Sequence, residues 1–252
     1  MQILKYKKMS NGKYKIELDN GIDMELYEEV ILKYELLLKK SIDQAMIPII
    51  QDSNLEWEVY YVALKSLKQR FKSAYDLRSS LVKKEYPVDL VDKAVNRLLE
   101  QGYLNDASFA KGYINNQIIT SSKGPNSISN DLRNKGIEEK IIREEIVVFD
   151  RDLQSSRIKK IIDKNIKSNH NKGGSVLKNK IITNLLNLGY DLGIVQMIIS
   201  DYQFGNDIEL AKKEYDKLYK KLSRKYSGEE LKYKIKEKLY QKGLKYEEVD
   251  WW

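Results

Sequence analysis

The chain has 252 residues, enough for one buried core or for a row of small ones. Its composition, with 33% charged residues and only 13 glycines and 3 prolines, favours a mostly helical protein over a β-sandwich. The absence of cysteine excludes disulfides and thiolate metal sites, and no segment approaches the ~18 apolar residues of a membrane span. Because the first residues also lack the apolar stretch of a signal peptide, we expect a cytoplasmic protein without membrane contact.

The N-terminal region is expected to contain a small β-hairpin and helices. Residues 13–18 alternate between polar and apolar types, and Asp19-Asn20-Gly21 supplies turn chemistry before a second strand at 22–26. Helical periodicity follows at 27–40, and Pro48 is expected to kink or interrupt the next helix. The polar run at 52–54 predicts a turn or helix N-cap, and with it the end of this region.

Helical periodicity then continues through three further segments. Residues 55–71 place Val59 and Ala63 on one face, and the following helix does the same with Leu77 and Leu81. A helix after residue 87 ends at Gly102, and Asn105 or Asp106 can cap the helix after it. We expect three side chains at this corner to lie in the core: Tyr103, Leu104 and Phe109.

One pattern of leucine, turn and renewed apolar spacing recurs four times. Its turn positions are separated by 51, 53 and 54 residues, and they are Glu85, Gly136, Gly189 and Gly243. Glycine is expected where a helix ends at positive φ, and a glutamate there costs about 1 kcal/mol. Four copies at a near-constant period favour a tandem array of three-helix modules over chance.

The predicted fold is therefore mainly α. Four tandem three-helix modules form an elongated, curved array behind the N-terminal hairpin and helix. The predicted domains are residues 1–53 for the N-terminal region, then 54–106, 107–150, 151–204 and 205–252 for the modules.

Two polar stretches read as connectors. Residues 120–126 contain Gly124-Pro125 and predict an exposed loop. This loop either only connects two helices or contacts a phosphate or a partner through its backbone, with Lys123 supplying the charge. Residues 165–175 are the most linker-like stretch and hold the only histidine, His170, which lacks metal-ligand neighbours and is expected at the surface.

Positive charge is concentrated in the C-terminal half. Residues 151–252 hold 22 basic and 14 acidic residues, whereas residues 1–150 are balanced at 23 of each. A single lysine is usually a solvated surface residue, but a local excess suggests an acidic partner or a polyanion. Four tyrosines, at positions 215, 219, 226 and 233, alternate with the densest cluster of basic residues. They could stack on nucleic-acid bases, although we expect at least half of them to pack in the core. That cluster is Lys212, Lys213, Lys220, Lys221, Arg224 and Lys225.

The sequence resembles the RecX family, bacterial regulators of the RecA recombinase. The most specific matching segments are Gly102-Tyr103-Leu104-Asn105-Asp106 with Phe109-Ala110, and Lys123-Gly124-Pro125 followed by 132–137. The chain departs from the family at Glu85-Tyr86, where glycine is usual, and at Ser108, where arginine is frequent, so a contact through that arginine is not expected.

The resemblance implies a regulator that binds RecA–DNA filaments, bridges protomers, and lowers ATP hydrolysis, strand exchange and co-protease activity. The implied partners are a RecA-type filament and its single-stranded DNA, and the protein is expected to bind them as a monomer. Besides the six cations of the C-terminal cluster, the candidate contact residues are Lys123, Arg133 and Lys135.

Enzyme chemistry is poorly supported. There is no P-loop motif, no G-x-S-x-G, no second histidine and no cysteine, and acidic pairs such as Glu138-Glu139 fit solvated helix faces. We expect no catalytic residue, no metal and no cofactor. The alternative class is a direct, non-specific DNA-binding helical protein, although the acidic helix at 138–148 is a poor reader of a major groove.

Overall fold

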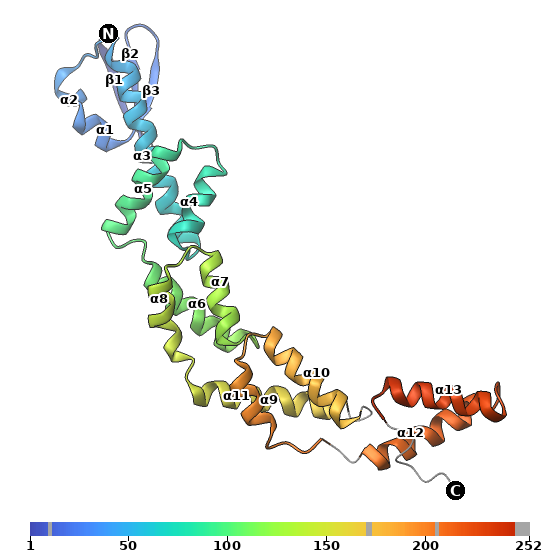
Figure 1. The fold of residues 1–252 in the computed structure, drawn as a ribbon. Coiled ribbons are helices and arrows are strands. Elements are labelled where there is room, and N and C mark those ends of the chain that lie inside the picture. The colour runs from blue at the N-terminus through green and yellow to red at the C-terminus, as the bar shows by residue number, and fades with distance from the viewer. Residues whose placement is uncertain (10–11, 170–172, 205–206, 245–252) are drawn as a thin grey trace. The chain divides into compact units, whose positions relative to one another are not determined.

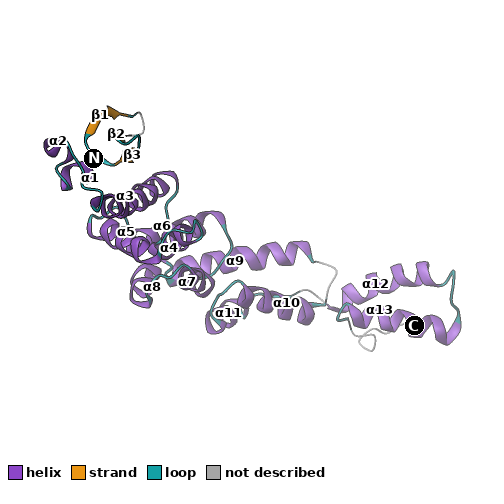
Figure 2. Cartoon of the chain, turned by 90° about the horizontal axis from the view of Figure 1, so that it is seen from above, coloured by secondary structure: helices purple, strands orange, loops and turns teal. Residues whose placement is uncertain are grey.

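A three-stranded antiparallel sheet opens the fold of the computed structural model, which describes residues 1–9, 12–169, 173–204 and 207–244. β2 (Tyr14–Leu18) pairs with β3 (Asp23–Leu26), so the expected hairpin is confirmed. β1 (Ile3–Lys8) adds a strand that its sequence did not predict, because the strand exposes most of its lysine-rich length. Figure 2 shows the strands only at the N-terminal end of the part drawn.

Three helices follow the sheet: α1 (Glu28–Lys33), α2 (Leu36–Lys39) and α3 (Met46–Gln69). The turn predicted at 52–54 is wrong, because α3 runs through it without a break. Those polar residues make tertiary contacts instead. Lys33 donates to the Oγ of Ser53 at 3.2 Å, and the side chain of Asn54 accepts from the N–H of Tyr27 at 2.9 Å. Pro48 lies in the first turn of α3, where its missing N–H breaks no helical hydrogen bond.

The remainder of the described chain is helical, as predicted (Figure 1). Contacts between Cα atoms divide the chain into two compact units, residues 1–110 with 133–141 and residues 111–132 with 142–252. The module boundaries predicted from the repeat, and the curvature of the array, stay predictions. The helices are α4 (Ala74–Val82), α5 (Val88–Glu100), α6 (Asp106–Thr120), α7 (Pro125–Asn134), α8 (Glu139–Glu145), the 3-10 turn η1 (Ile146–Val148), α9 (Arg151–Ser168), α10 (Gly174–Asn187), α11 (Leu192–Ile199), α12 (Asp207–Leu222) and α13 (Gly228–Gln241).

The four predicted turn positions share one conformation. The φ angle is 65° at Glu85, 71° at Gly136, 89° at Gly189 and 72° at Gly243. At each turn the N–H donates to the carbonyl three residues earlier, at 2.8–2.9 Å. This is the helix ending expected from the repeat, and it holds even where glutamate replaces glycine.

Each glycine turn receives the start of a helix that lies earlier in the chain. The Oγ of Ser73 donates to the carbonyl of Lys135 at 2.8 Å, and the N–H of Gly124 donates to that of Leu188 at 2.6 Å. The N–H of Gly173 donates to the carbonyl of Lys242 at 2.9 Å. We call these three contacts joints, because each ties the residue that precedes α4, α7 or α10 to the residue just before a glycine turn.

The joints explain why glycine is needed at three turns and not at the fourth. A Cβ on Gly136 would lie 2.4 Å from the Cβ of Tyr75, and one on Gly243 would lie 2.1 Å from a methyl of Val176. Glu85 is exposed, and within the described residues the carbonyl of Lys84 accepts no hydrogen bond from a helix start. Only the strain of positive φ therefore opposes a side chain at position 85.

Three local expectations need correction. Tyr103 is 61% exposed and not in the core, whereas Leu104 and Phe109 are buried as predicted. Gly124 is buried in its joint, so the segment at 120–126 is not a wholly exposed connector. The linker expected at 165–175 is shorter than predicted, because α9 extends to Ser168 and α10 starts at Gly174. His170 lies outside the described residues.

Candidate partner-binding surface

The last two helices form a hairpin that carries the densest positive charge. α12 and α13 lie side by side in both views (Figures 1 and 2), around a core of Ala211, Ile235 and Leu239. Leu218 and Leu222 pack against this core. The opposite side of α12 is thereby left to solvent, as expected of an amphipathic helix.

The six cations predicted from the sequence lie together on this hairpin, and all are exposed. Four are on α12 and two are in the turn after it. None of the six makes an ion pair or hydrogen bond through its side chain within the described residues. Lys213 and Lys220 are seven residues apart on one side of α12, about 10.5 Å along its axis. We call this set the C-terminal cationic patch: Lys212, Lys213, Lys220, Lys221, Arg224 and Lys225.

A buried glutamate on α12 does not cancel the patch, because other lysines neutralise it. Glu214 is only 5% exposed, and its carboxylate accepts from Lys217 at 3.1 Å and from Lys242. Burial by itself would raise the pKa of Glu214, but hydrogen bonds from Lys242 and Lys217 outweigh it and lower the pKa. No local sequence pattern indicates this arrangement, since Lys242 is 28 residues away.

The interleaved tyrosines divide into two groups. Tyr215 and Tyr226 pack against the hairpin core, whereas Tyr219 is 47% and Tyr233 is 66% exposed. Tyr215 and Tyr219 also stack on each other, with ring centroids 5.9 Å apart. The two exposed rings are therefore available for stacking on a base or on a partner side chain.

The other three candidate contact residues are engaged in ion pairs of their own. Lys123 lies 2.5 Å from Asp131, and Lys135 lies 3.1 Å from Asp76. Arg133 makes a two-pronged pair with Glu139 at 2.8 and 3.0 Å. A partner would have to compete with these contacts, which the cations of the patch do not make.

A clamp around Arg157 was also missed by sequence reasoning. Its guanidinium donates to the carbonyls of Ile118 and Ser121, both at 2.5 Å, and to the hydroxyl of Tyr190 at 3.2 Å. These bonds brace the joint between Gly124 and Gly189, because Tyr190 follows the turn directly. A lone arginine on a helix gives no sequence signal for such a role.

No group of three or more His, Asp or Glu among the described residues is placed to hold a metal ion. None of the helices found there combines the length and the apolar character needed to cross a membrane.

Comparisons with known proteins show which family the chain resembles. The family model described as RecX, second three-helix domain, matches residues 105–145, which span α6, α7 and α8. The regulatory protein RecX of Listeria innocua is 28% identical over 241 residues, which cover 94% of this chain and 89% of the relative. That of Halalkalibacterium halodurans is 29% identical over 257 residues, which cover 98% and 96%.

Solved structures agree with the sequence comparisons. A crystal structure of regulatory protein RecX superposes with a TM-score of 0.73 at 25% identity, covering 80% of this chain and 99% of that one. The structure of RecX from Lactobacillus salivarius, at 23% identity and a TM-score of 0.56 over 59% of this chain and 97% of that one, supports the fold. The matched relatives are named regulatory proteins, and the matched family model describes a three-helix domain. Its sequence and fold are similar to those of RecX regulatory proteins.

Proposed function

We propose that this protein binds RecA-type recombinase filaments on single-stranded DNA. Bound there, it lowers the ATP hydrolysis, strand exchange and co-protease activity of the recombinase in DNA repair and the SOS response. The likeness to curated RecX proteins over nearly the whole chain is the observation that carries the proposal. The protein acts in the cytoplasm as a monomer and without a cofactor.

The proposed mechanism is binding and restraint. A row of modules tied by joints can bridge neighbouring recombinase protomers and resist the rearrangements that accompany ATP turnover. The C-terminal cationic patch anchors the row by attracting the phosphates of the DNA strand. Lys123, Arg133 and Lys135 are weaker candidates for such contacts, because each already holds a carboxylate.

The charge of the patch sets an expected salt dependence. Each phosphate contact on a single strand contributes about 0.7 to the slope of log affinity against log salt, so six contacts give about 4. Between 50 and 200 mM salt, affinity would then fall about 300-fold. A variant with Lys212, Lys213, Lys220 and Lys221 changed to Glu should lose about 2.8 of this slope, and an unchanged slope would contradict the role of the patch.

A direct, non-specific DNA-binding protein is the second candidate, and the patch is the observation that favours it. Base reading by α8 is disfavoured, because Glu139, Glu144 and Glu145 give that helix an acidic surface. Contacts to the phosphate backbone alone remain compatible with either function.

The deciding experiment is a titration of the cognate recombinase with this protein. We expect the DNA-dependent ATPase rate to fall at ratios well below one copy per protomer, with no ATP turnover by this protein alone. An unchanged ATPase rate, together with tight and salt-sensitive binding to naked DNA, would replace the proposal with the second candidate.

A further inference from the structure

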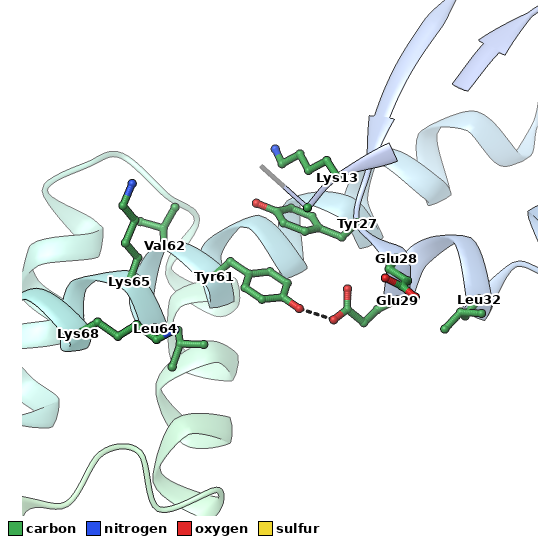
Figure 3. A pocket seen from close by; sticks show the side chains of 11 residues that line it. Lys13, Tyr27, Glu28, Glu29, Leu32, Tyr61, Val62, Leu64, Lys65 and Lys68 are labelled. Atoms are coloured by element: carbon green, nitrogen blue, oxygen red, sulfur yellow. Dashed lines mark hydrogen bonds between the residues drawn. The ribbon is translucent and has the colours of Figure 1, made fainter. Parts of the chain in front are cut away.

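A cavity of about 650 Å³ lies between α1 and α3 in the N-terminal unit (Figure 3). Its walls include the rings of Tyr27 and Tyr61, which stack with centroids 4.8 Å apart. A cavity of this volume is in the range that binds a small molecule or a few side chains of a partner.

Apart from Lys13, which lies over the ring of Tyr27 and pairs with Glu58, the charges around the cavity are separated by sign. Glu28 and Glu29 come from α1 and lie on one side of Tyr61, whereas Lys65 and Lys68 come from α3 and lie on the other (Figure 3). Both lysines are exposed and make no ion pair within the described residues. The cavity therefore presents an acidic end and a basic end.

The acidic end contains an acceptor without a donor. Tyr61 donates its hydroxyl proton to one carboxylate oxygen of Glu29, while the other oxygen, Oε2, is buried and has no hydrogen-bond partner. The hydrogen bond to Glu29, with burial, raises the pKa of Tyr61 to about 12, so Tyr61 stays a donor at neutral pH. Unpaired buried acceptors are costly, so a basic side chain close to this carboxylate would be favourable.

Apolar side chains also line the cavity. Leu32 of α1, which lies beyond Glu28 at the acidic end in Figure 3, is 63% exposed, and Val62 and Leu64 of α3 are half-buried. An exposed leucine in a cavity that tyrosine rings also line is typical of protein-binding surfaces. Nucleic acid is a poor occupant of the acidic end, because the carboxylates of Glu28 and Glu29 repel phosphates.

We infer that this cavity docks a segment of a protein partner. The segment carries an apolar side chain for the tyrosine rings in the middle, a basic side chain for Glu28 and Glu29, and an acidic one for Lys65 and Lys68. The stretch of α3 from Tyr61 to Lys68 is about 10.5 Å long, which two turns of a partner helix span. The inference rests on the proposed function, since the partner is then the recombinase protein and not its DNA.

The test compares charge reversal at the cavity with a matched reversal elsewhere in the same unit. In the full chain, Lys65→Glu with Lys68→Glu should weaken binding to DNA-free recombinase about tenfold and raise the concentration needed to inhibit its ATPase. The control, Lys83→Glu with Lys84→Glu, changes two exposed lysines beyond the cavity and should bind as the wild type does. All four lysines are exposed, so both variants should fold, and their melting temperatures check this.

A photo-crosslinking residue at Leu32 gives a second readout. We expect it to form a covalent adduct with the recombinase protein and not with the oligonucleotide of the filament. If wild-type protein inhibits the ATPase but the cavity variant binds DNA-free recombinase as tightly as the control, this inference alone fails. Adducts to the oligonucleotide would also overturn it. If the wild type neither binds nor inhibits the recombinase, the proposed function fails too.

Discussion

The joint at Gly189 gives a sharp test of how neighbouring modules are held together. Changing Gly189 to Ala places a Cβ 2.4 Å from the backbone nitrogen of Ser127, closer than real Cβ contacts come. The joint must open, and it then loses two hydrogen bonds: Gly124 to the carbonyl of Leu188 at 2.6 Å, and Asn126 to that of Gly189 at 3.1 Å. At about 1 kcal/mol each, with about 1 kcal/mol for positive φ, the loss is about 3 kcal/mol.

Gly102 supplies the matched control. Its φ is 73°, and a Cβ built on it meets nothing within 4 Å. Gly102→Ala should therefore cost only the backbone term of about 1 kcal/mol. The free energy of unfolding of both variants can be measured by urea denaturation. Equal losses in the two variants would refute the joint as the reason for glycine at position 189.

Three further predictions concern the core, the unusual turn and the buried acid. Phe109→Ala should cost about 3–5 kcal/mol in thermal or urea unfolding, because Phe109 is buried against Phe71, and a loss under about 1 kcal/mol would contradict its core role. Glu85→Gly should stabilise the protein by up to about 1 kcal/mol by relieving positive φ, and destabilisation would show that the side chain makes a needed contact. The lowered pKa of Glu214 means that its contribution to stability is present above the usual glutamate pKa and is lost as pH falls through the folded value. Lys242→Met should move that loss to higher pH in melting curves between about pH 3 and about pH 6, and an unchanged pH profile would exclude the ion pair as its cause.

Local signals predicted the helices and the turns well. A helix that ends at positive φ has a recognisable sequence pattern over four neighbouring residues. Because that pattern recurs, it located all four turns, including the one at Glu85. The predictions failed where tertiary contacts determine a residue's environment more strongly than its local sequence does. Asn54 looks like a turn residue, yet it lies inside α3 and contacts the backbone of Tyr27. Tyr103 looks like a core residue by its apolar neighbours but is exposed.

The candidate surfaces divide in the same way. The C-terminal cationic patch is contiguous in sequence, so charge counting alone locates it. The ion pair of Lys135 with Asp76 joins residues 59 positions apart, and no local pattern indicates it. The cavity beside Tyr61 likewise exists only because α1 packs on α3. Sequence thus located the candidate anchor for a polyanion but gave no sign of the proposed docking site for a protein.

The joints also imply that the two ends of the repeat differ in how easily a further module could be added. At the C-terminal end, Ser227 precedes α13 as Ser73 precedes α4, and a Cβ on Gly228 would meet nothing within 4 Å. An added module ending in a glycine turn would find a helix start there of the type already used in the first joint. At the turn of Glu85, by contrast, a side chain stands where the other three turns carry glycine. If the repeat were extended with further joints of this kind, Ser227 would accept one as it is, whereas position 85 would first need a substitution to glycine.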